Sequence, residues 1–117
     1  MISSGINYSL SDFDGFNVLD LSGSLTIHTS DAFISVVHNL TERGSLIINM
    51  KNVNFMTSSG LNALIDVSYY ARERGHRVIL MSPDIDIIDI IEYADYFSHM
   101  IFAESPEEGK TKIEYYT

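Results

Sequence analysis

The chain has 117 residues, a formal net charge of −9 and an isoelectric point near 4.6. This length fits one compact domain over residues 1–117, and the 45% of hydrophobic residues are enough to build its core. The chain has only seven Lys and Arg residues against sixteen Asp and Glu residues in total. Neither nucleic acid nor an anionic membrane surface is therefore expected as a partner. A protein partner fits this charge better.

Cysteine is absent, which excludes a disulfide, a thiolate nucleophile and a cysteine-based zinc site. The first residues lack the basic opening and apolar run of a signal peptide, and no stretch approaches the roughly 18 consecutive apolar residues of a membrane span. We therefore expect a cytoplasmic protein without membrane insertion. The histidines have no metal-ligand spacing, so no metal or cofactor is expected; they are His28, His38, His76 and His99.

An antiparallel pair of strands is expected at the N-terminus. Residues 6–11 alternate between polar side chains and apolar ones, the last of which is Leu10, as in a half-buried strand. Asp14-Gly15 follows as a two-residue hairpin signal. Residues 16–23 are then the returning strand.

A first helix is expected after this hairpin, with Thr29 or Ser30 as its N-cap and Gly44 at its C′ position. Its apolar stripe has the spacing i, i+3, i+4 and i+7. The stripe consists of Phe33, Val36, Val37 and Leu40. Residues 45–50 follow as a mostly apolar strand buried on both faces.

A second helix is expected to end at Gly75, after two arginines that suit a helix C-terminus. Its stripe consists of Leu61, Leu64, Ile65 and Tyr69. Residues 77–81 form a further buried strand. A third helix is expected to begin with Ser82 as its cap and Pro83 at the first helical position.

The third helix has two distinct faces. Its expected inner face consists of Ile87, Ile88, Ile91 and Ala94. Its outer side is acidic and solvated, and this charge would suit a partner with basic groups; it consists of Asp84, Asp86, Asp89 and Glu92. Three aromatic residues at its end are expected to close the core rather than form an exposed contact patch: Tyr93, Tyr96 and Phe97.

A last strand and a last helix complete the chain. Residues 99–103 form the strand, and Ser105 with Glu108 has the spacing of a capping box. Gly109 lowers helix propensity, so this helix is expected to be short or frayed. Alternating strands and helices predict a single α/β domain with about four helices, in which a mixed sheet has parallel inner strands and an antiparallel N-terminal edge strand.

Three hydroxyl residues, Thr57, Ser58 and Ser59, precede Gly60 where a strand gives way to a helix. Taken by itself, this pattern is typical of a helix start at which Ser58 or Ser59 caps the first turn and Gly60 keeps the turn tight. The same place lies at the carboxyl edge of the sheet, where sites on open α/β sheets gather and where a helix N-terminus tolerates an anion. The same strand–helix junction is therefore compatible with both interpretations, a helix cap and a functional site.

Four segments of the sequence resemble the STAS family, whose best-known members are bacterial anti-sigma factor antagonists. They are "GSLT" at 23–26, "LIINMKNVNFMTSSGLNAL" at 46–64, "RERGHRVIL" at 72–80 and "SPDI" at 82–85. The resemblance implies that Ser58 is phosphorylated by a cognate anti-sigma factor that is also a serine kinase. Phosphorylation would end the binding of that partner, and a phosphatase would restore it.

Two positions depart from the family pattern. Thr57 stands where an aspartate usually precedes the acceptor serine, and Thr26 stands where an acidic residue usually follows "G-x-L". Both replacements remove a carboxylate that could orient the acceptor or a metal bound to the kinase. They leave open a STAS module that binds its partner without a covalent switch.

Three functional hypotheses follow. The first is a non-enzymatic antagonist switched at Ser58, whose partner surface is Thr57, Ser59, Gly60, Leu61, Asn62, Ser24 and Thr26. A scaffold or docking subunit of a stress-signalling or transport complex is the second. An enzyme with Ser58 as nucleophile is the third and the weakest, because the sequence has no G-x-S-x-G elbow. The oligomeric state is left open.

Overall fold

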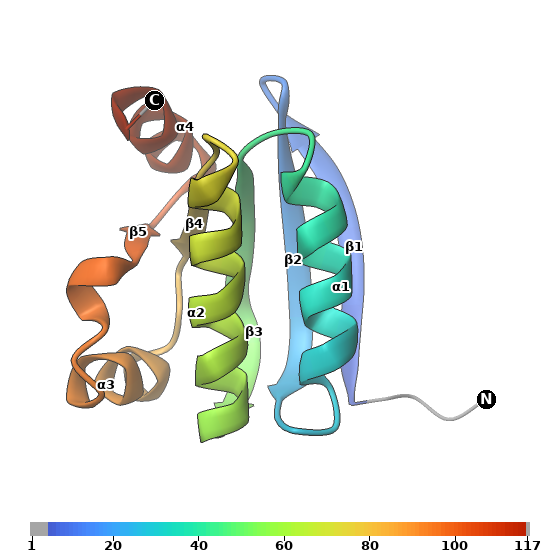
Figure 1. The fold of residues 1–117 in the computed structure, drawn as a ribbon, viewed down its shortest axis with the longest axis vertical. Helices are drawn as coiled ribbons and strands as arrows, with labels where there is room; N and C mark the ends of the chain where they lie inside the picture. The colour runs from blue at the N-terminus through green and yellow to red at the C-terminus, as the bar shows by residue number, and fades with distance from the viewer. Residues whose placement is uncertain (1–4, 117) are drawn as a thin grey trace.

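The computed structural model of the protein describes residues 5–116. Within them, a five-stranded sheet has the strand order β1-β2-β3-β4-β5, with β1 antiparallel to β2 and all other neighbours parallel (Figure 1). The elements in chain order are β1 (Ile6–Phe13), β2 (Phe16–Leu25), α1 (Ser30–Thr41), β3 (Leu46–Met56), α2 (Ser58–Glu73), β4 (Val78–Met81), α3 (Ile85–Tyr93), a 3-10 turn (Phe97–His99), β5 (Ile101–Ala103) and α4 (Pro106–Tyr116). The predicted fold class is confirmed.

The N-terminal hairpin turns at Asp14 and Gly15, as predicted. Their φ angles are 50° and 88°, which the two-residue turn requires and which glycine adopts without strain. The predicted alternation in β1 holds for the buried Ile6 but is wrong for Leu10, whose side chain is 52% exposed. Leu10 lines a surface groove together with Leu40 and Arg43 at the C-terminal end of α1, where its side chain stays accessible.

Helices cover both faces of the sheet. α1 and α2 lie side by side on one face, where they bury the larger apolar cluster together with α3 (Figure 1). Phe33 and Val37 of α1 are fully buried there, and the other two residues of the predicted stripe are half-buried against them. On the opposite face, α4 packs Ile113 onto a smaller cluster that contains Ile47 and Ile79.

Two predicted helix boundaries are wrong, the C-terminus of α1 and the N-terminus of α3. α1 ends at Thr41, before Gly44, so Gly44 is not its C′ residue. α3 begins at Ile85 rather than at Pro83, and its N-cap is Asp84, whose carboxylate accepts a hydrogen bond of 2.6 Å from the Asp86 N–H. Ser82 is instead tied to the end of β5: its N–H donates to the Ala103 carbonyl at 2.9 Å and its hydroxyl donates to the Glu104 carbonyl at 3.3 Å.

Asp84→Ala is expected to destabilise the protein by about 1 kcal/mol, because it removes the side-chain cap of α3. The effect is measured as a lower urea midpoint. Glu92→Ala is the matched control, since Glu92 is an exposed carboxylate in the last turn of the same helix. Equal midpoints for the two variants would show that the Asp84 cap does not stabilise α3.

The N-terminus of α4 is capped as predicted, but the predicted fraying is wrong. The Glu108 N–H donates to Ser105 Oγ at 3.1 Å, and the Glu108 carboxylate accepts from the Glu104 N–H at 2.8 Å. α4 then continues for 11 residues. Gly109 is buried against the sheet, where an added Cβ would lie 2.9 Å from Ile47 Cδ1, so this glycine permits close helix–sheet packing.

These contacts give the Glu108 carboxyl a depressed pKa. The hydrogen bond from the Glu104 N–H and then that from Lys112 hold the pKa below its ordinary value of 4.5. The resulting stabilisation is present above pH 4.5 and is lost as the pH falls through the lower pKa of the folded state. Glu108→Gln should therefore flatten the acid limb of a plot of unfolding free energy against pH. An acid limb as steep as that of the wild type would contradict this.

Candidate functional site

At the junction between β3 and α2, the residue at the N-cap position differs from the one predicted from the sequence. Thr57, rather than Ser58 or Ser59, occupies the N-cap position, and Ser58 is the first residue of the helix. The Thr57 N–H donates to the Leu25 carbonyl at 3.0 Å, and its hydroxyl points to the same oxygen at 3.5 Å. That hydroxyl faces β2, and the Thr57 side chain makes no capping hydrogen bond to the first turn of α2.

Ser58 is the most accessible of the three hydroxyl residues. Thr57 and Ser59 are both half-buried, whereas Ser58 is exposed. The first amides of α2 point outward at this end, where the helix dipole adds a partial positive charge. An anion attached to Ser58 would therefore meet hydrogen-bond donors rather than a buried apolar surface.

The loop between β2 and α1 lies against the start of α2, so the two parts of the predicted partner surface come together (Figure 1). The Ser30 hydroxyl joins them, lying 2.5 Å from the Thr26 carbonyl and 3.2 Å from the Ser59 carbonyl. Ser24 pairs in register with Phe55 near the end of β3. Ser24 and Thr26 are both half-buried, whereas Ser58 is exposed.

Gly60 makes this close approach possible. A Cβ at this position would lie 2.4 Å from the Leu25 carbonyl oxygen and 2.8 Å from both Leu25 Cβ and Met56 Cγ. Leu61 is 7% exposed and packs in the core, while Asn62 is exposed one residue later. Of the residues predicted after Ser59, Asn62 is therefore the one whose side chain is exposed.

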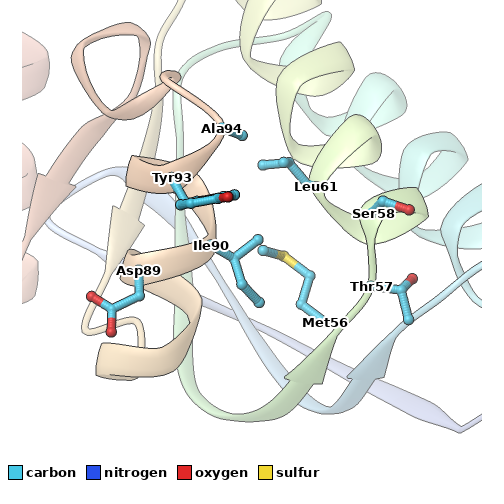
Figure 2. A pocket seen from close by; sticks show the side chains of 8 residues that line it. All are labelled: Met56, Thr57, Ser58, Leu61, Asp89, Ile90, Tyr93 and Ala94. Atoms are coloured by element: carbon cyan, nitrogen blue, oxygen red, sulfur yellow. The ribbon is translucent and has the colours of Figure 1, made fainter.

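A pocket of about 520 Å³ lies between the start of α2 and α3. It is lined by Met56, Thr57, Ser58, Leu61, Asp89, Ile90, Tyr93 and Ala94. Figure 2 shows Met56 and Ile90 close together, with Ser58 and Leu61 on the α2 side and Tyr93 on the α3 side. The sequence analysis did not predict that α3 contributes to this pocket. The only signal in the sequence was that Asp89, Ile90 and Tyr93 are close together on one helix.

The core role predicted for Tyr93 is wrong. Its side chain is 96% exposed, and Phe97 is also exposed at 41%, while Tyr96 packs half-buried against the core. Tyr93 follows Ile91 by two residues, which is a rotation of about 200° around a helix, so it cannot share the buried side of Ile91. Of the alternative considered for this residue, an exposed contact patch, the structure shows the exposure.

Charge is distributed unevenly around the site. The four carboxylates of α3 are all exposed, as predicted: Asp84, Asp86, Asp89 and Glu92. The four arginines lie at or beyond the C-terminal ends of α1 and α2, at the opposite edge of the sheet: Arg43, Arg72, Arg74 and Arg77. The pocket thus lies at an acidic end of the molecule.

The histidines form no metal site in residues 5–116, where no group of three or more potential ligands gathers. His38 instead lies 2.6 Å from Asp66 and stacks on the ring of Tyr70, with 3.6 Å between the centroids. His99 Nδ1 lies 2.8 Å from the Tyr69 hydroxyl. Within the same range, no helix has both the length and the apolar character needed to cross a membrane.

A family model described as the STAS domain matches residues 8–109. No curated protein matches the chain. Among solved structures, the chain resembles the unphosphorylated anti-sigma factor antagonist SpoIIAA of Bacillus, with 19% identity, a TM-score of 0.73, and coverage of 92% of this chain and 96% of that chain. An anti-sigma factor antagonist from Mycobacterium paratuberculosis has 16% identity and a TM-score of 0.81, with 97% of each chain covered.

A third similar structure is the murine anion transporter solute carrier 26 family member A9, with 17% identity and a TM-score of 0.76. The match covers 90% of this chain but 18% of the transporter. At such identities, these structures show a shared fold. The family model spans most of the sequence, from residue 8 to residue 109. The chain belongs to the STAS domain family.

Proposed function

We propose that this protein is a cytoplasmic anti-sigma factor antagonist. In this role it binds an anti-sigma factor that is also a serine kinase, phosphorylation of Ser58 ends the binding, and a phosphatase restores it. The observation that carries the proposal is the exposed Ser58 at the uncapped start of α2, beside the pocket. Two similar structures, both of anti-sigma factor antagonists, support it.

Electrostatics explains how such a switch would leave the fold intact. A phosphoserine carries about −1.5 to −2 charges at pH 7. Next to the start of α2, this charge would gain roughly 0.3 to 1 kcal/mol from the helix dipole. At an interface, by contrast, a misplaced charge can cost several kcal/mol. Phosphorylation would therefore weaken partner binding far more than it changes stability.

The proposed partner surface combines both loops at this edge. Ser58 and Asn62 are its exposed members, with Thr57, Ser59, Ser24 and Thr26 half-buried around them. Gly60 and Leu61 lie beneath and hold the surface in place. We propose that these residues bind a protein rather than carry out catalysis.

A second candidate is a STAS docking module without a covalent switch, within a stress-signalling or transport complex. The Thr57 hydroxyl favours it, because it faces the Leu25 carbonyl where the family pattern has a carboxylate. Thr26 likewise supplies no carboxylate; its hydroxyl accepts a hydrogen bond from the His28 N–H at 3.1 Å. The similarity to a domain-sized part of an anion transporter is consistent with this alternative.

Phosphosite mapping separates the two candidates. The protein is incubated with ATP, Mg²⁺ and lysate of its own host, and cleavage after Lys51 and Arg72 then isolates residues 52–72. We expect phosphate on Ser58. Phosphate on Thr57 would keep a switch but refute the assigned residue. No phosphate, in a lysate that modifies a known antagonist, would favour the docking module.

A further inference from the structure

The pocket between α2 and α3 is apolar inside and bordered by an exposed aromatic ring. Met56, Leu61 and Ile90 provide apolar lining, and Tyr93 of α3 is 96% exposed beside them. Ile85, at the start of the same helix, is 66% exposed. Pockets that hold drug-sized groups measure about 300–1,000 Å³, so this one can accept a large apolar side chain.

The outer wall of this pocket is acidic. Asp89 lines it, and Figure 2 shows the Asp89 carboxylate directed away from the pocket centre, on the side opposite Ser58. Asp86 and Glu92 are exposed on the same helix. None of the lining residues carries a positive charge. A second copy of this chain, with its own net charge of −9, would be repelled here, whereas a surface with basic groups would be attracted.

We infer that this pocket selects the partner, by accepting a bulky apolar side chain that is flanked by Lys or Arg on the partner's surface. The inference rests on the proposed function, because it assigns chemistry to the partner that binds beside Ser58. The apolar side chain fills the pocket between the start of α2 and α3, and the flanking cations face the carboxylates of α3. Aromatic residues such as Tyr93 often dominate the binding energy of such contacts, whereas a charge at the rim mainly affects the association rate and its salt dependence.

This arrangement is consistent with a switch at Ser58. Ser58 borders the apolar side of the pocket, across from the acidic wall of α3 (Figure 2). A phosphate there would have to lose water when the partner's apolar side chain entered, and desolvation of an unpaired charge is strongly unfavourable. The flanking cations would lie on the far side, where they could not neutralise it.

The inference can be tested with synthetic peptides and the intact protein. Three hexapeptides separate the apolar and charged contributions: Arg-Arg-Leu-Leu-Arg-Arg, Glu-Glu-Leu-Leu-Glu-Glu and Arg-Arg-Ser-Ser-Arg-Arg. In ¹H–¹⁵N NMR titrations, we expect the first peptide to shift the amides of residues 56–61 and 89–94. Each of the other two should bind roughly tenfold more weakly or not at all.

Two pairs of matched variants assign the binding to the pocket. Tyr93→Ala should lower the affinity for the first peptide by roughly fivefold or more. Tyr115→Ala, which changes an 81%-exposed tyrosine of α4, should not lower it. Asp89→Lys should lower the affinity for the first peptide severalfold and reduce the salt dependence of its binding. Glu107→Lys on α4 should change neither the affinity nor its salt dependence. Both targets are exposed, so folding is preserved in all four variants.

Shifts confined to another surface, equal affinity for the Glu peptide, or unchanged affinity of Tyr93→Ala would overturn the inference. Its failure is separable from failure of the proposed function, since the titrations involve neither a kinase nor a change at Ser58. Phosphorylation of Ser58 without peptide binding in the pocket would refute only the inferred chemistry. Peptide binding in the pocket without phosphorylation of Ser58 would support that chemistry and refute the switch.

Discussion

Gly60→Ala is expected to destabilise the protein by about 2 to 3 kcal/mol. The new methyl group would lie 2.4 Å from the Leu25 carbonyl oxygen, and backbone cannot move aside as a flexible side chain can. Alanine would gain about 1 kcal/mol of helix propensity over glycine, which offsets only part of the overlap. The start of α2 would be pushed away from β2, and with it the surface that surrounds Ser58.

Urea unfolding measures this effect, with Gly44→Ala as the matched control. A Cβ at Gly44 would meet nothing within 4 Å, so that variant should stay within about 0.5 kcal/mol of the wild type. A Gly60→Ala protein as stable as the wild type would show that the contact between α2 and β2 is not tight. The position of Ser58 against the β2–α1 loop would then need another explanation.

Ser58→Asp is expected to lower the affinity for the anti-sigma factor at least 100-fold, a loss of about 3 kcal/mol. The carboxylate would lie at an interface beside an apolar pocket, where the bound partner would remove part of its water. Stability should change little or rise slightly, because the negative charge lies at the start of α2. Ser58→Ala should bind like the wild type.

Calorimetric titration and thermal unfolding of the same samples separate loss of binding from loss of fold. Ser11→Asp is the matched control, because Ser11 is an exposed serine of β1, near the hairpin at the opposite edge of the sheet (Figure 1). Its affinity should equal that of the wild type. Equal affinities for Ser58→Asp and Ser58→Ala would contradict a switch based on charge at this position.

The features predicted correctly from the sequence depend on neighbouring residues. Asp14-Gly15 adopts positive φ angles that few other pairs allow, and Gly75, with a φ of 79°, follows the end of α2. Alternation of strands and single helices was enough to predict parallel pairing of the inner strands. Such signals are local, so they can be recognised without knowing what packs against them.

The predictions that failed depend on contacts between distant parts of the chain. Gly109 weakens an isolated helix, yet contact with Ile47, some sixty residues earlier, makes it fit α4. Ser82 has the right chemistry for a cap but is held by the carbonyls of Ala103 and Glu104. At the site, Thr57 became the N-cap because its N–H pairs with β2.

The pocket was missed for the same reason. Its α2 side follows from the "TSSG" loop, but its α3 side depends on how α3 packs beside α2. Helical periodicity alone places Tyr93 on a different face of the helix from the buried Ile91, so its exposure could have been predicted from the sequence. What Tyr93 lies beside could be learned only from the fold.

The most direct test of the switch is calorimetric titration of the anti-sigma factor with this protein before and after stoichiometric phosphorylation of Ser58. An at least 100-fold loss of affinity, reversed by phosphatase treatment, is the predicted result. Equal affinity for the two forms would contradict the proposal and leave a STAS module that binds its partner without a covalent switch.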